Sequence, residues 1–431
     1  MARNRVIYQS EALYVSRTDE TANKKGCQVN QGIDSLAGSV TPTAGERPKY
    51  IQRVQNANYS FSIERQDVNQ FGNLAAIDRI ILSSPTVSLD FQYLVGNLAN
   101  EDTLGFKVNT VNTATASLVS AISKILDKTG DEKCYYIKTV DEGLDERDVA
   151  RAASASVIGL GNGYITSYST EGSVGNFPTV SVNVEALNMK VYDAASGHIP
   201  AVTQSTGVAN STNFFQLPAG ADNANTATGK HALPSTVTDG QISVLRPGDI
   251  SFSFQHKASL GGSYTTWGST NATASNNSAS GTLSDGNHVA GPNMSQAAND
   301  TDVAAKLQSY NISFDISRTP LEKLGSKFAF SREIDFPVTV SMSIEAMVAD
   351  MKKGGLDQLV ADDGFFHLNV DLNKPGTSTL VAGYHLIGAK LDSQEFSSGI
   401  GDNKSVTLNF SSQIGGPNDT DSGFFMEGIF S

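Results

Sequence analysis

The sequence predicts a mainly β protein built from two tandem units, each with one short helix. Three observations support this fold class: a long internal repeat, strict alternation of polar and apolar residues, and a composition rich in Gly, Ser, Asn and Thr. Only 17% of the 431 residues are charged. A polar mixture with few charges favours sheets with long polar loops over helix bundles.

The repeat is the strongest of these observations. Residues 54–95 recur without a gap as residues 307–348, and Arg65 corresponds to Arg318 at an offset of 253 (318 − 65). The other matched residues are Ser60, Phe61, Ile63, Gly72, Arg79, Thr86, Val87 and Ser88, which recur as Ser313, Phe314, Ile316, Gly325, Arg332, Thr339, Val340 and Ser341. A repeat of this kind indicates that one structural unit occurs twice.

Each copy continues with a helix candidate, an aromatic strand and two further strands. Apolar residues at helical spacing predict helices at Ala116–Lys128 and at about Met347–Ala361, although Gly354-Gly355 weakens the second. Matched strands follow at 134–137 and 365–368, 156–161 and 384–389, and 179–184 and 405–410. The predicted organisation is an N-terminal arm with strands (1–47), a first unit (48–190), a polar insert with extra strands and a flexible loop (191–302), a second unit (303–415) and an apolar tail (416–431).

Segments outside the two units are expected to pack against them. Gln241–Gln255 alternates and predicts strands added to the second unit, and Met1–Ser16 plays the same part for the first. Chain ends usually fray unless they are docked, so an apolar tail predicts packing on this subunit or on a neighbour. The tail residues expected to pack are Phe424, Phe425, Ile429 and Phe430.

The strands of both units have one apolar and one polar face, which places one face on a core and the other in water. The polar face carries no Lys or Arg. Such a face lines a channel for a polyanion without clamping its phosphates, or it reflects chance in a chain of net charge −13 with few basic residues. The candidates for lining a lumen are Ser60, Ser62, Glu64, Ser88, Asp90, Gln92, Ser181, Asn183, Glu185, Ser313, Asp315, Ser341, Ser343, Glu345, Thr407 and Asn409.

The connections Gln66–Ala76 and Thr319–Ala329 are long for hairpin loops, which usually have about two to five residues. Both contain apolar residues and a central Gly. These side chains either form a docking surface on a projecting loop or fold back onto their own sheet. The candidates for contacts between stacked assemblies are Val68, Phe71, Gly72, Leu74, Leu321, Leu324, Gly325 and Phe328.

Catalytic motifs are absent from the sequence. It contains no phosphate loop, no His-Glu-x-x-His, no Gly-x-Ser-x-Gly and no kinase signature. The glycine-rich run Gly159–Gly163 precedes a strand instead of a helix, so it predicts a turn or bulge. Asp419–Gly423 resembles a calcium loop but lacks the distal Glu. The sequence therefore predicts no enzyme and assigns no catalytic, cofactor-binding or metal-binding residue.

Charge and cysteine usage limit the partners. An acidic chain does not bind nucleic acid by neutralising phosphates. Cys27 and Cys134 have no spacing that implies a disulfide framework or a metal site, so both are expected to be free thiols. The sequence has neither a signal peptide nor an apolar run of about 20 residues, so no membrane partner is expected.

The order strand, long loop, strand, helix and paired strands resembles the tail tube proteins of long-tailed bacteriophages. The resemblance is carried by Asn58–Arg65, Phe71-Gly72, Arg79–Ile81 and Pro85–Leu89 with their copies, and by the opening Arg5–Val15. It covers 48–190 and 303–415. It implies β-sandwich or split-barrel units whose sheets join those of neighbours into a closed ring barrel.

In that family, rings of six units stack through the long hairpin loop. Because this chain carries two units, the resemblance implies a homotrimeric, pseudo-hexameric ring whose lumen conducts viral DNA without specific binding. The implied partners are copies of itself and the tape measure, terminator and baseplate proteins. The implied location is the phage tail, assembled in the cytoplasm of the host bacterium.

Two other classes of protein are alternatives. One is another duplicated β virion protein, such as a baseplate hub or a capsid decoration protein. The other is a carbohydrate-binding module, against which the missing signal peptide and the single tryptophan, Trp267, argue.

Overall fold

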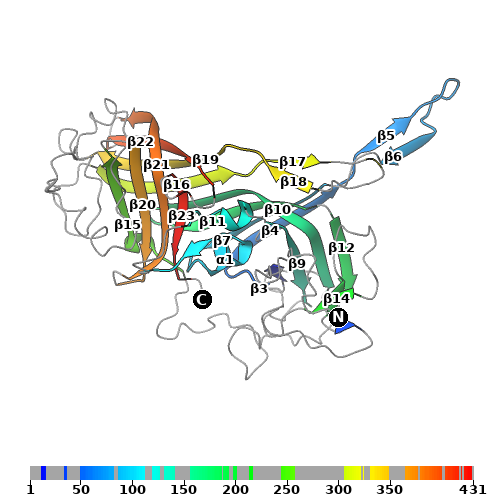
Figure 1. Ribbon diagram of the computed structural model, residues 1–431, viewed down its shortest axis with the longest axis horizontal. Helices are drawn as coiled ribbons and strands as arrows, with labels where there is room; N and C mark the ends of the chain where they lie inside the picture. The colour runs from blue at the N-terminus through cyan, green and yellow to red at the C-terminus, as the bar shows by residue number, and fades with distance from the viewer. Residues whose placement is uncertain are drawn as a thin grey trace.

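The computed structural model describes residues 11–15, 34–35, 49–81, 86–111, 119–126, 131–140, 156–186, 188–193, 198–200, 213–216, 244–257, 305–321, 324, 331–348, 365–376, 379–399, 403–416, 419 and 422–429. These residues form a mainly β fold, as predicted (Figure 1). The helical elements are α1 (Ala99–Leu104), α2 (Ser123–Leu126) and the 3-10 turn η5 (Pro247–Asp249).

The strands of the first half are β1 (Glu11–Val15), β2 (Asp34–Ser35), β3 (Lys49–Tyr50), β4 (Val54–Ser62), β5 (Arg65–Val68), β6 (Asp78–Ile81), β7 (Thr86–Leu94), β8 (Val108–Asn109), β9 (Lys133–Thr139), β10 (Ser156–Ser173), β11 (Thr179–Ala186) and β12 (Asn188–Asp193). They are followed by β13 (His198–Pro200), β14 (Asn213–Gln216) and β15 (Ile250–Lys257). The strands of the second half are β16 (Ala305–Asp315), β17 (Arg318–Leu321), β18 (Ser331–Ile334), β19 (Val338–Val348), β20 (Phe365–Asn373), β21 (Leu380–Ser397), β22 (Ser405–Ile414) and β23 (Gly423–Gly428).

The main structural feature is one continuous antiparallel sheet in the order β21-β22-β19-β16-β10-β11-β7-β4, which we call the central sheet. Its two halves repeat the same strand order, because β16-β19-β22-β21 corresponds to β4-β7-β11-β10. The halves join where β10 pairs with β16, from Ser167 opposite Asp315 to Ser173 opposite Ser309. We call this pairing the internal seam. The two copies of the repeat therefore contribute to a single sheet, which is open at β4 and β21 in the part of the chain that the structure describes.

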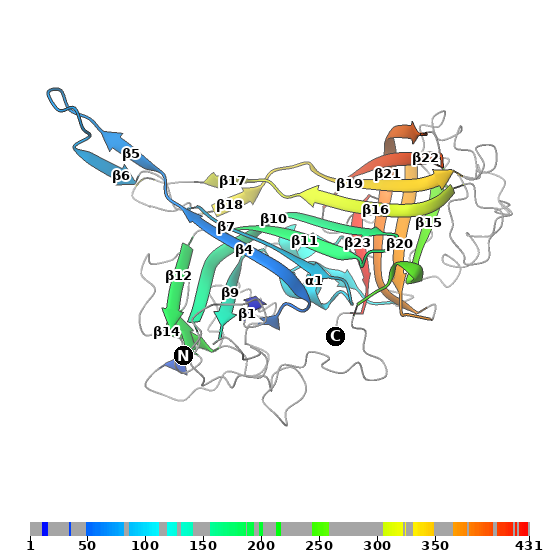
Figure 2. The same ribbon diagram turned by 180° about the vertical axis from the view of Figure 1, so that it is seen from behind.

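β10 and β21 each belong to two sheets. Their C-terminal parts lie in the central sheet, whereas the N-terminal part of β10 pairs with β9 and β12 and that of β21 pairs with β20 and β23. A bulge follows Ile165 in β10, and another follows Leu391 at the equivalent position of β21. Bulges bend a strand and increase its twist. The smaller sheets consequently lie at opposite ends of the central sheet (Figures 1 and 2).

The glycine-rich run in β10 is a bulge, as predicted. The pairing of β9 with β10 shifts register between Leu160 and Gly163. A Cβ atom on Gly163 would lie 2.8 Å from the ring of Tyr135 and 3.0 Å from Val184. Glycine is required here because the backbone of β10 passes close to side chains of the core.

Among the described residues, the first predicted helix is shorter than expected, and the second, about Met347–Ala361, is described only at residues 347 and 348, because residues 349–361 lie outside the described part of the chain. Within Ala116–Lys128 the described helix is only α2, because the backbone of Ala121 bonds to other segments: its N–H donates to Phe424 O at 2.9 Å and its C=O accepts from Lys107 at 2.7 Å. Met347 lies in β19, where it pairs with Ser405. The ladders to β16 and β22 continue through this position and override its helical spacing.

The added strands agree with the expectation from sequence. β1 pairs with β9 and β15 pairs with β20, so the N-terminal arm and the insert each add a strand to one half. The tail forms β23, where Phe424 and Phe425 are fully buried. Ile429 was also expected to pack but is 40% exposed. Its backbone is nevertheless docked, since its N–H donates to Val381 O at 2.9 Å and its C=O accepts from the N–H of Leu98 at 2.9 Å. Phe430 and Val6–Tyr8 lie outside the described residues.

The expected free thiol at Cys134 is wrong, because Cys134 is disulfide-bonded. Its side chain is fully buried in β9. Cys27, the other cysteine of the chain, lies outside the described residues. Spacing along the chain could not reveal this bond because a disulfide depends on tertiary proximity.

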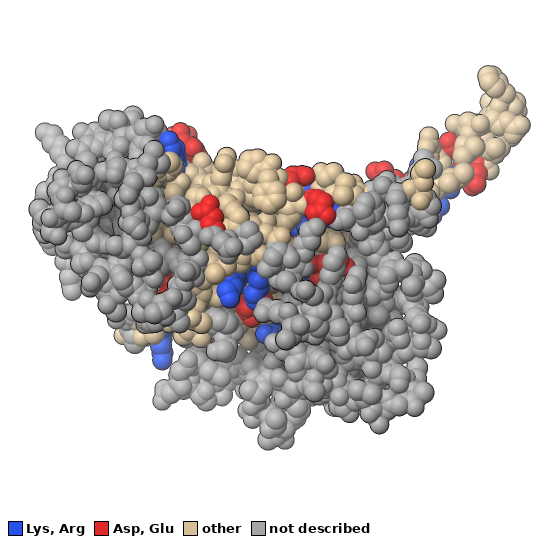
Figure 3. Space-filling view, in the orientation of Figure 1, with Lys and Arg blue, Asp and Glu red and all other residues tan. Residues whose placement is uncertain are grey.

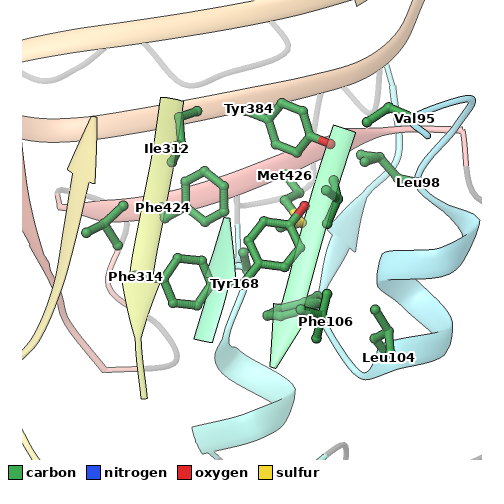
Figure 4. Packing of buried hydrophobic residues seen from close by; sticks show 14 of the residues in the cluster. Val95, Leu98, Leu104, Phe106, Tyr168, Ile312, Phe314, Tyr384, Phe424 and Met426 are labelled. Carbon is green, nitrogen blue, oxygen red and sulfur yellow. The ribbon is translucent and has the colours of Figure 1, made fainter. Parts of the chain in front are cut away.

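The hydrophobic core extends across the internal seam. Tyr168 of β10 stacks on Phe314 of β16 with their ring centroids 5.4 Å apart, and Phe314 also contacts Phe424 at 5.6 Å (Figure 4). Phe106 meets Tyr168 edge-on at 4.9 Å. Aromatic pairs of this kind stabilise a fold by about 0.5–1.5 kcal/mol each beyond the area that they bury. The two halves therefore share one core.

Candidate assembly surfaces

The central sheet has one buried face and one polar face. Directly opposed residues in neighbouring strands lie on the same face of a sheet. One row of opposed residues crosses all the strands from β4 to β21: Asn56, Gln92, Ser181, Ser169, Ser313, Ser341, Ser411 and Lys390. The polar faces of the two halves therefore form one continuous surface.

With one exception, the sequence-predicted lumen candidates lie on this face. The exception is Glu64, for which strict alternation was wrong. β4 ends at Ser62, and Glu64 lies between β4 and β5 where the chain leaves the central sheet. Sequence reasoning also missed residues of β10 and β21 on this face, although both strands alternate. They are Ser167, Ser169, Glu171, Ser393 and Glu395.

Short polar side chains bond to one another across the polar face. Ser60 and Ser88 share a hydrogen bond of 2.7 Å, and the amide of Asn58 donates to Asp90 at 2.8 Å. The amide of Asn183 donates to Ser167 at 2.7 Å. The equivalent amide in the second half, on Asn409, donates to Ser393 at 2.8 Å. Both halves thus use the same cross-strand chemistry.

The charge of the polar face is not purely acidic. Lys390 of β21 lies at one corner, with Nζ 5.1 Å from the centre of the Phe365 ring. Arg332 extends from β18 to Glu185, with Nη1 2.8 Å from Oε1. Among the described side chains, the rest of the polar face holds acidic and uncharged groups. Cations therefore occur at its margin, which corrects the expectation of a cation-free face; Figure 3 shows the sparse charges of the described surface in one orientation.

Two projecting β-ribbons replace the predicted long loops. β5 pairs with β6 and β17 pairs with β18, and we call these ribbons the first and second arm. The first arm extends far beyond the rest of the molecule (Figure 1). At its tip, Gly72 adopts a positive φ of 91° with open space around it, a conformation that side chains disfavour.

The side chains at the arm tips do not fold back onto the sheet. Phe71 and Leu74 of the first arm and Leu324 of the second are fully exposed. Leu321 is exposed to a lesser extent and Val68 is half-buried. Gly325 and Phe328 lie outside the described residues. Of the two interpretations of these apolar residues, the structure excludes back-folding for Phe71, Leu74 and Leu324.

A cluster of charged and aromatic groups holds the base of the second arm against the first half. Arg318 forms an ion pair with Asp131, and both side chains are almost fully buried. The guanidinium carbon of Arg318 lies 4.8 Å from the centre of the Tyr164 ring, and that of Arg332 lies 5.8 Å from it. These contacts cross the internal seam. In the first arm, Arg79 pairs instead with Asp67 of its own ribbon at 2.5 Å.

The central sheet ends at two strand edges that no described strand covers. They are the outer edge of β4 and the outer edge of the C-terminal part of β21. Large apolar side chains are exposed on both strands: Tyr59 (37%) and Phe61 (40%) on β4, and Phe396 (43%) on β21. A long unpaired strand with exposed aromatic residues is a template for pairing with another chain.

No known protein family and no curated protein matches this chain. A solved structure titled "Crystal structure of Hcp protein" matches 42% of this chain and 99% of its own chain, at 10% identity and a TM-score of 0.19. A likeness at this score carries no argument about function.

The described residues contain no helix with the length and apolar character needed to cross a membrane. They also contain no group of three or more His, Cys, Asp or Glu side chains arranged to hold a metal ion. In the calcium-loop-like segment, the described Asp419 accepts a hydrogen bond from the hydroxyl of Ser422 at 3.1 Å.

Proposed function

We propose that the protein is a structural component that assembles into stacked rings, as the major tail tube protein of a long-tailed bacteriophage. One observation carries the proposal: the central sheet is already a joined pair of repeated halves, and it ends at two edges that no described strand covers. Adding further copies edge to edge extends the sheet, and closing it into a ring removes both edges.

The copy number of the ring is inferred from the repeat together with the rings of six units that the resemblance to tail tube proteins implies. Each chain supplies two equivalent halves, so a ring of six halves contains three chains. The contact between copies is heterologous, because β4 and β21 are different strands, and such a contact closes only at a fixed number of copies. The proposed ring is therefore a homotrimer with pseudo-hexameric symmetry.

The polar face of the central sheet is proposed to line the lumen. The opposite face is covered by the core of the subunit, so only the polar face remains for the inside of a closed ring. Its acidic side chains repel phosphate within a screening length of about 10 Å, and its uncharged side chains do not attract phosphate electrostatically. Viral DNA would pass through the lumen without being bound.

The arms are proposed to join one ring to the next. Phe71, Leu74 and Leu324 carry apolar surface away from the subunit, and that surface is buried when a neighbouring ring receives it. Tape measure, terminator and baseplate proteins would be the remaining partners, in the phage tail.

Electron microscopy of the purified protein tests the proposal directly. We expect tubes of uniform width with three chains in each ring. Rings of six chains would contradict the trimer, and closed rings that never stack would favour a baseplate hub. A protein that stays monomeric at every concentration and salt condition would contradict the function itself.

The role of the polar face is tested by adding positive charges to the proposed lumen. The double variant Ser88→Lys with Ser341→Lys is expected to assemble but to retain DNA during ejection, so that infectivity falls. The matched control Ser88→Glu with Ser341→Glu changes the same sites and should eject normally. Normal infectivity of the lysine variant would reject the lumen role.

The role of the arms is tested at their tips. Phe71→Ala with Leu324→Ala is expected to leave soluble subunits or single rings, because the apolar contact between rings is lost. Gln70→Ala, an exposed polar change beside Phe71, is the matched control and should form tubes. Unaltered tubes from the double variant would show that the arms do not stack the rings.

A further inference from the structure

The internal seam provides a template for a contact between two copies of this chain. Its partners are β10 of the first half and β16 of the second. The free strands at the two ends of the central sheet are their repeats, because β21 corresponds to β10 and β4 corresponds to β16. A second copy placed edge to edge would bring together the same two kinds of strand.

The correspondence of β10 with β21 is exact in register. Ser167 lies opposite Asn183, and Ser393 lies opposite Asn409, at an offset of 226 on both strands. The same asparagine-to-serine hydrogen bond and the same bulge occur at both places. Each residue of β10 at the internal seam therefore has a defined equivalent in β21.

The correspondence of β4 with β16 is equally direct. The offset of 253 comes from the repeat itself. β4 has a bulge between Val54 and Asn56 in its pairing with β7, and β16 has one between Leu307 and Ser309 in its pairing with β19. These bulges coincide under the same offset, so the two strands present equivalent edges.

Burial differs between the equivalent positions. At the internal seam Phe314 is 3% exposed and Ile312 is fully buried, whereas their repeats Phe61 and Tyr59 are 40% and 37% exposed. Thr170 of β10 is fully buried, whereas its equivalent Phe396 is 43% exposed. Positions on the core-facing side that are buried at the internal seam are thus exposed on the two outer strands, β4 and β21.

Resting on the proposed ring, we infer that β4 of one copy pairs antiparallel with β21 of the next in the register of the internal seam. The residues expected to lie opposite each other across the two copies are Ser62 and Ser393, Phe61 and Gln394, Ser60 and Glu395, Tyr59 and Phe396, and Asn58 and Ser397. The occupant of each free edge is therefore a second copy of this chain.

This register also suits the side chains. It places Tyr59 beside Phe396 on the apolar face and Ser60 beside Glu395 on the polar face. Successive side chains of a strand alternate between its two faces. A slip by one residue would therefore place Phe396 opposite a polar-face residue of β4 in the neighbouring copy. The polar row of the central sheet continues without a break into the next copy.

The seam between copies differs from the internal seam in one respect. The equivalents of Tyr164 and Glu185 are Lys390 and Ser411, so the aromatic ring and the carboxylate that hold the second arm have no counterpart. Accordingly, Arg79 of the first arm is paired with Asp67 instead. The copies are therefore joined by strand pairing without the contacts that Tyr164 and Glu185 make at the internal seam.

Disulfide trapping tests the register. Directly opposed residues of an antiparallel pair have Cα atoms about 4.5–5.5 Å apart, within the range that a disulfide spans. We expect Ser60→Cys with Glu395→Cys to form crosslinked dimers and trimers when assembled tubes are oxidised. The equivalent pair of the internal seam, Ser169→Cys with Ser313→Cys, is the positive control and should crosslink within single chains.

A displaced pair on the same face, Ser60→Cys with Ser397→Cys, is the matched negative control. We expect it to crosslink at least several-fold less. Tubes in which the displaced pair reacts and the opposed pair does not would overturn the register while leaving the tube function intact. Tubes in which neither pair reacts would overturn the edge pairing.

Failure of the wild-type protein to assemble would count against the proposed function instead of the register. If a cysteine variant fails to assemble although the wild-type protein does, a density map of wild-type tubes decides the question. Tyr59 beside Phe396 of the neighbouring copy supports the inference. Any other neighbour of Tyr59 overturns it.

Discussion

The stability of the protein is predicted to depend on pH because the carboxyl group of Glu101 is buried. Replacing Glu101 with Gln should remove this dependence. Glu101 lies in α1 and is fully buried beneath the central sheet. Its Oε1 atom accepts hydrogen bonds from the hydroxyls of Tyr93 at 2.8 Å and Tyr168 at 3.3 Å. Burial raises the pKa of Glu101 to about 7, since it has a larger effect than these hydrogen bonds, which lower the pKa.

The sign of the effect follows from proton uptake. Between the ordinary pKa of 4.5 and the folded pKa of about 7, the folded state holds a proton that the unfolded state has lost. Stability therefore falls as the pH rises through this window and is level above it. At about 1.36 kcal/mol per unit of pKa, the loss is about 3 kcal/mol.

Glutamine cannot ionise and keeps an oxygen that accepts both tyrosine hydroxyls. We expect Glu101→Gln to match the wild type within about 1 kcal/mol near pH 4 and to exceed it by about 3 kcal/mol near pH 8. Urea unfolding followed by circular dichroism, at protein concentrations too low for assembly, measures both values.

The exposed acid Glu345 provides a matched control, since Glu345→Gln makes the same chemical change on the polar face. The free energy of unfolding of the Glu345→Gln variant should depend on pH in the same way as that of the wild type. Parallel profiles for the wild type and Glu101→Gln would refute the argument, because they would show that Glu101 does not titrate differently in the folded and unfolded states.

Three further substitutions test the packing. Arg318→Ala should cost about 3–5 kcal/mol because it removes the buried guanidinium that forms an ion pair with the buried carboxylate of Asp131, whereas Arg65→Ala at the exposed repeat position should change the urea midpoint little. Gly428→Ala should cost about 1–3 kcal/mol in urea unfolding, since its Cβ would lie 2.3 Å from a backbone carbonyl oxygen of β21. Phe424→Ala should cost about 3–5 kcal/mol, measured in the same way, and a loss below 1 kcal/mol would contradict the shared core.

Features that leave a regular pattern in the sequence were predictable. The strand faces follow from alternation with a period of two residues, which is why the positions of Ser88, Val182 and Ile344 could be assigned in advance. The equivalence of the two halves followed from the repeat, and the roles of β1 and β15 followed from it in turn. Alternation is visible within a short window of sequence, and the repeat is visible when two segments 253 residues apart are compared.

The failures share a cause. The segment around Ala121 has helical spacing, but Lys107 and Phe424 take its backbone hydrogen bonds. Met347 has the same spacing and is held in β19 by two neighbouring strands. In both cases partners far away in the sequence decide the local conformation, and no local pattern records them.

The sequence by itself determined the β class, the duplication and the side of each strand that is polar. Only the tertiary structure decided that the two halves share one sheet and one core. Phe61 and Phe314 occupy the same position of the repeat, yet Phe314 is buried and Phe61 is exposed. The reason is physical: burial depends on which strand lies alongside, and β10 supplies that neighbour at Phe314, whereas no described strand supplies it at Phe61.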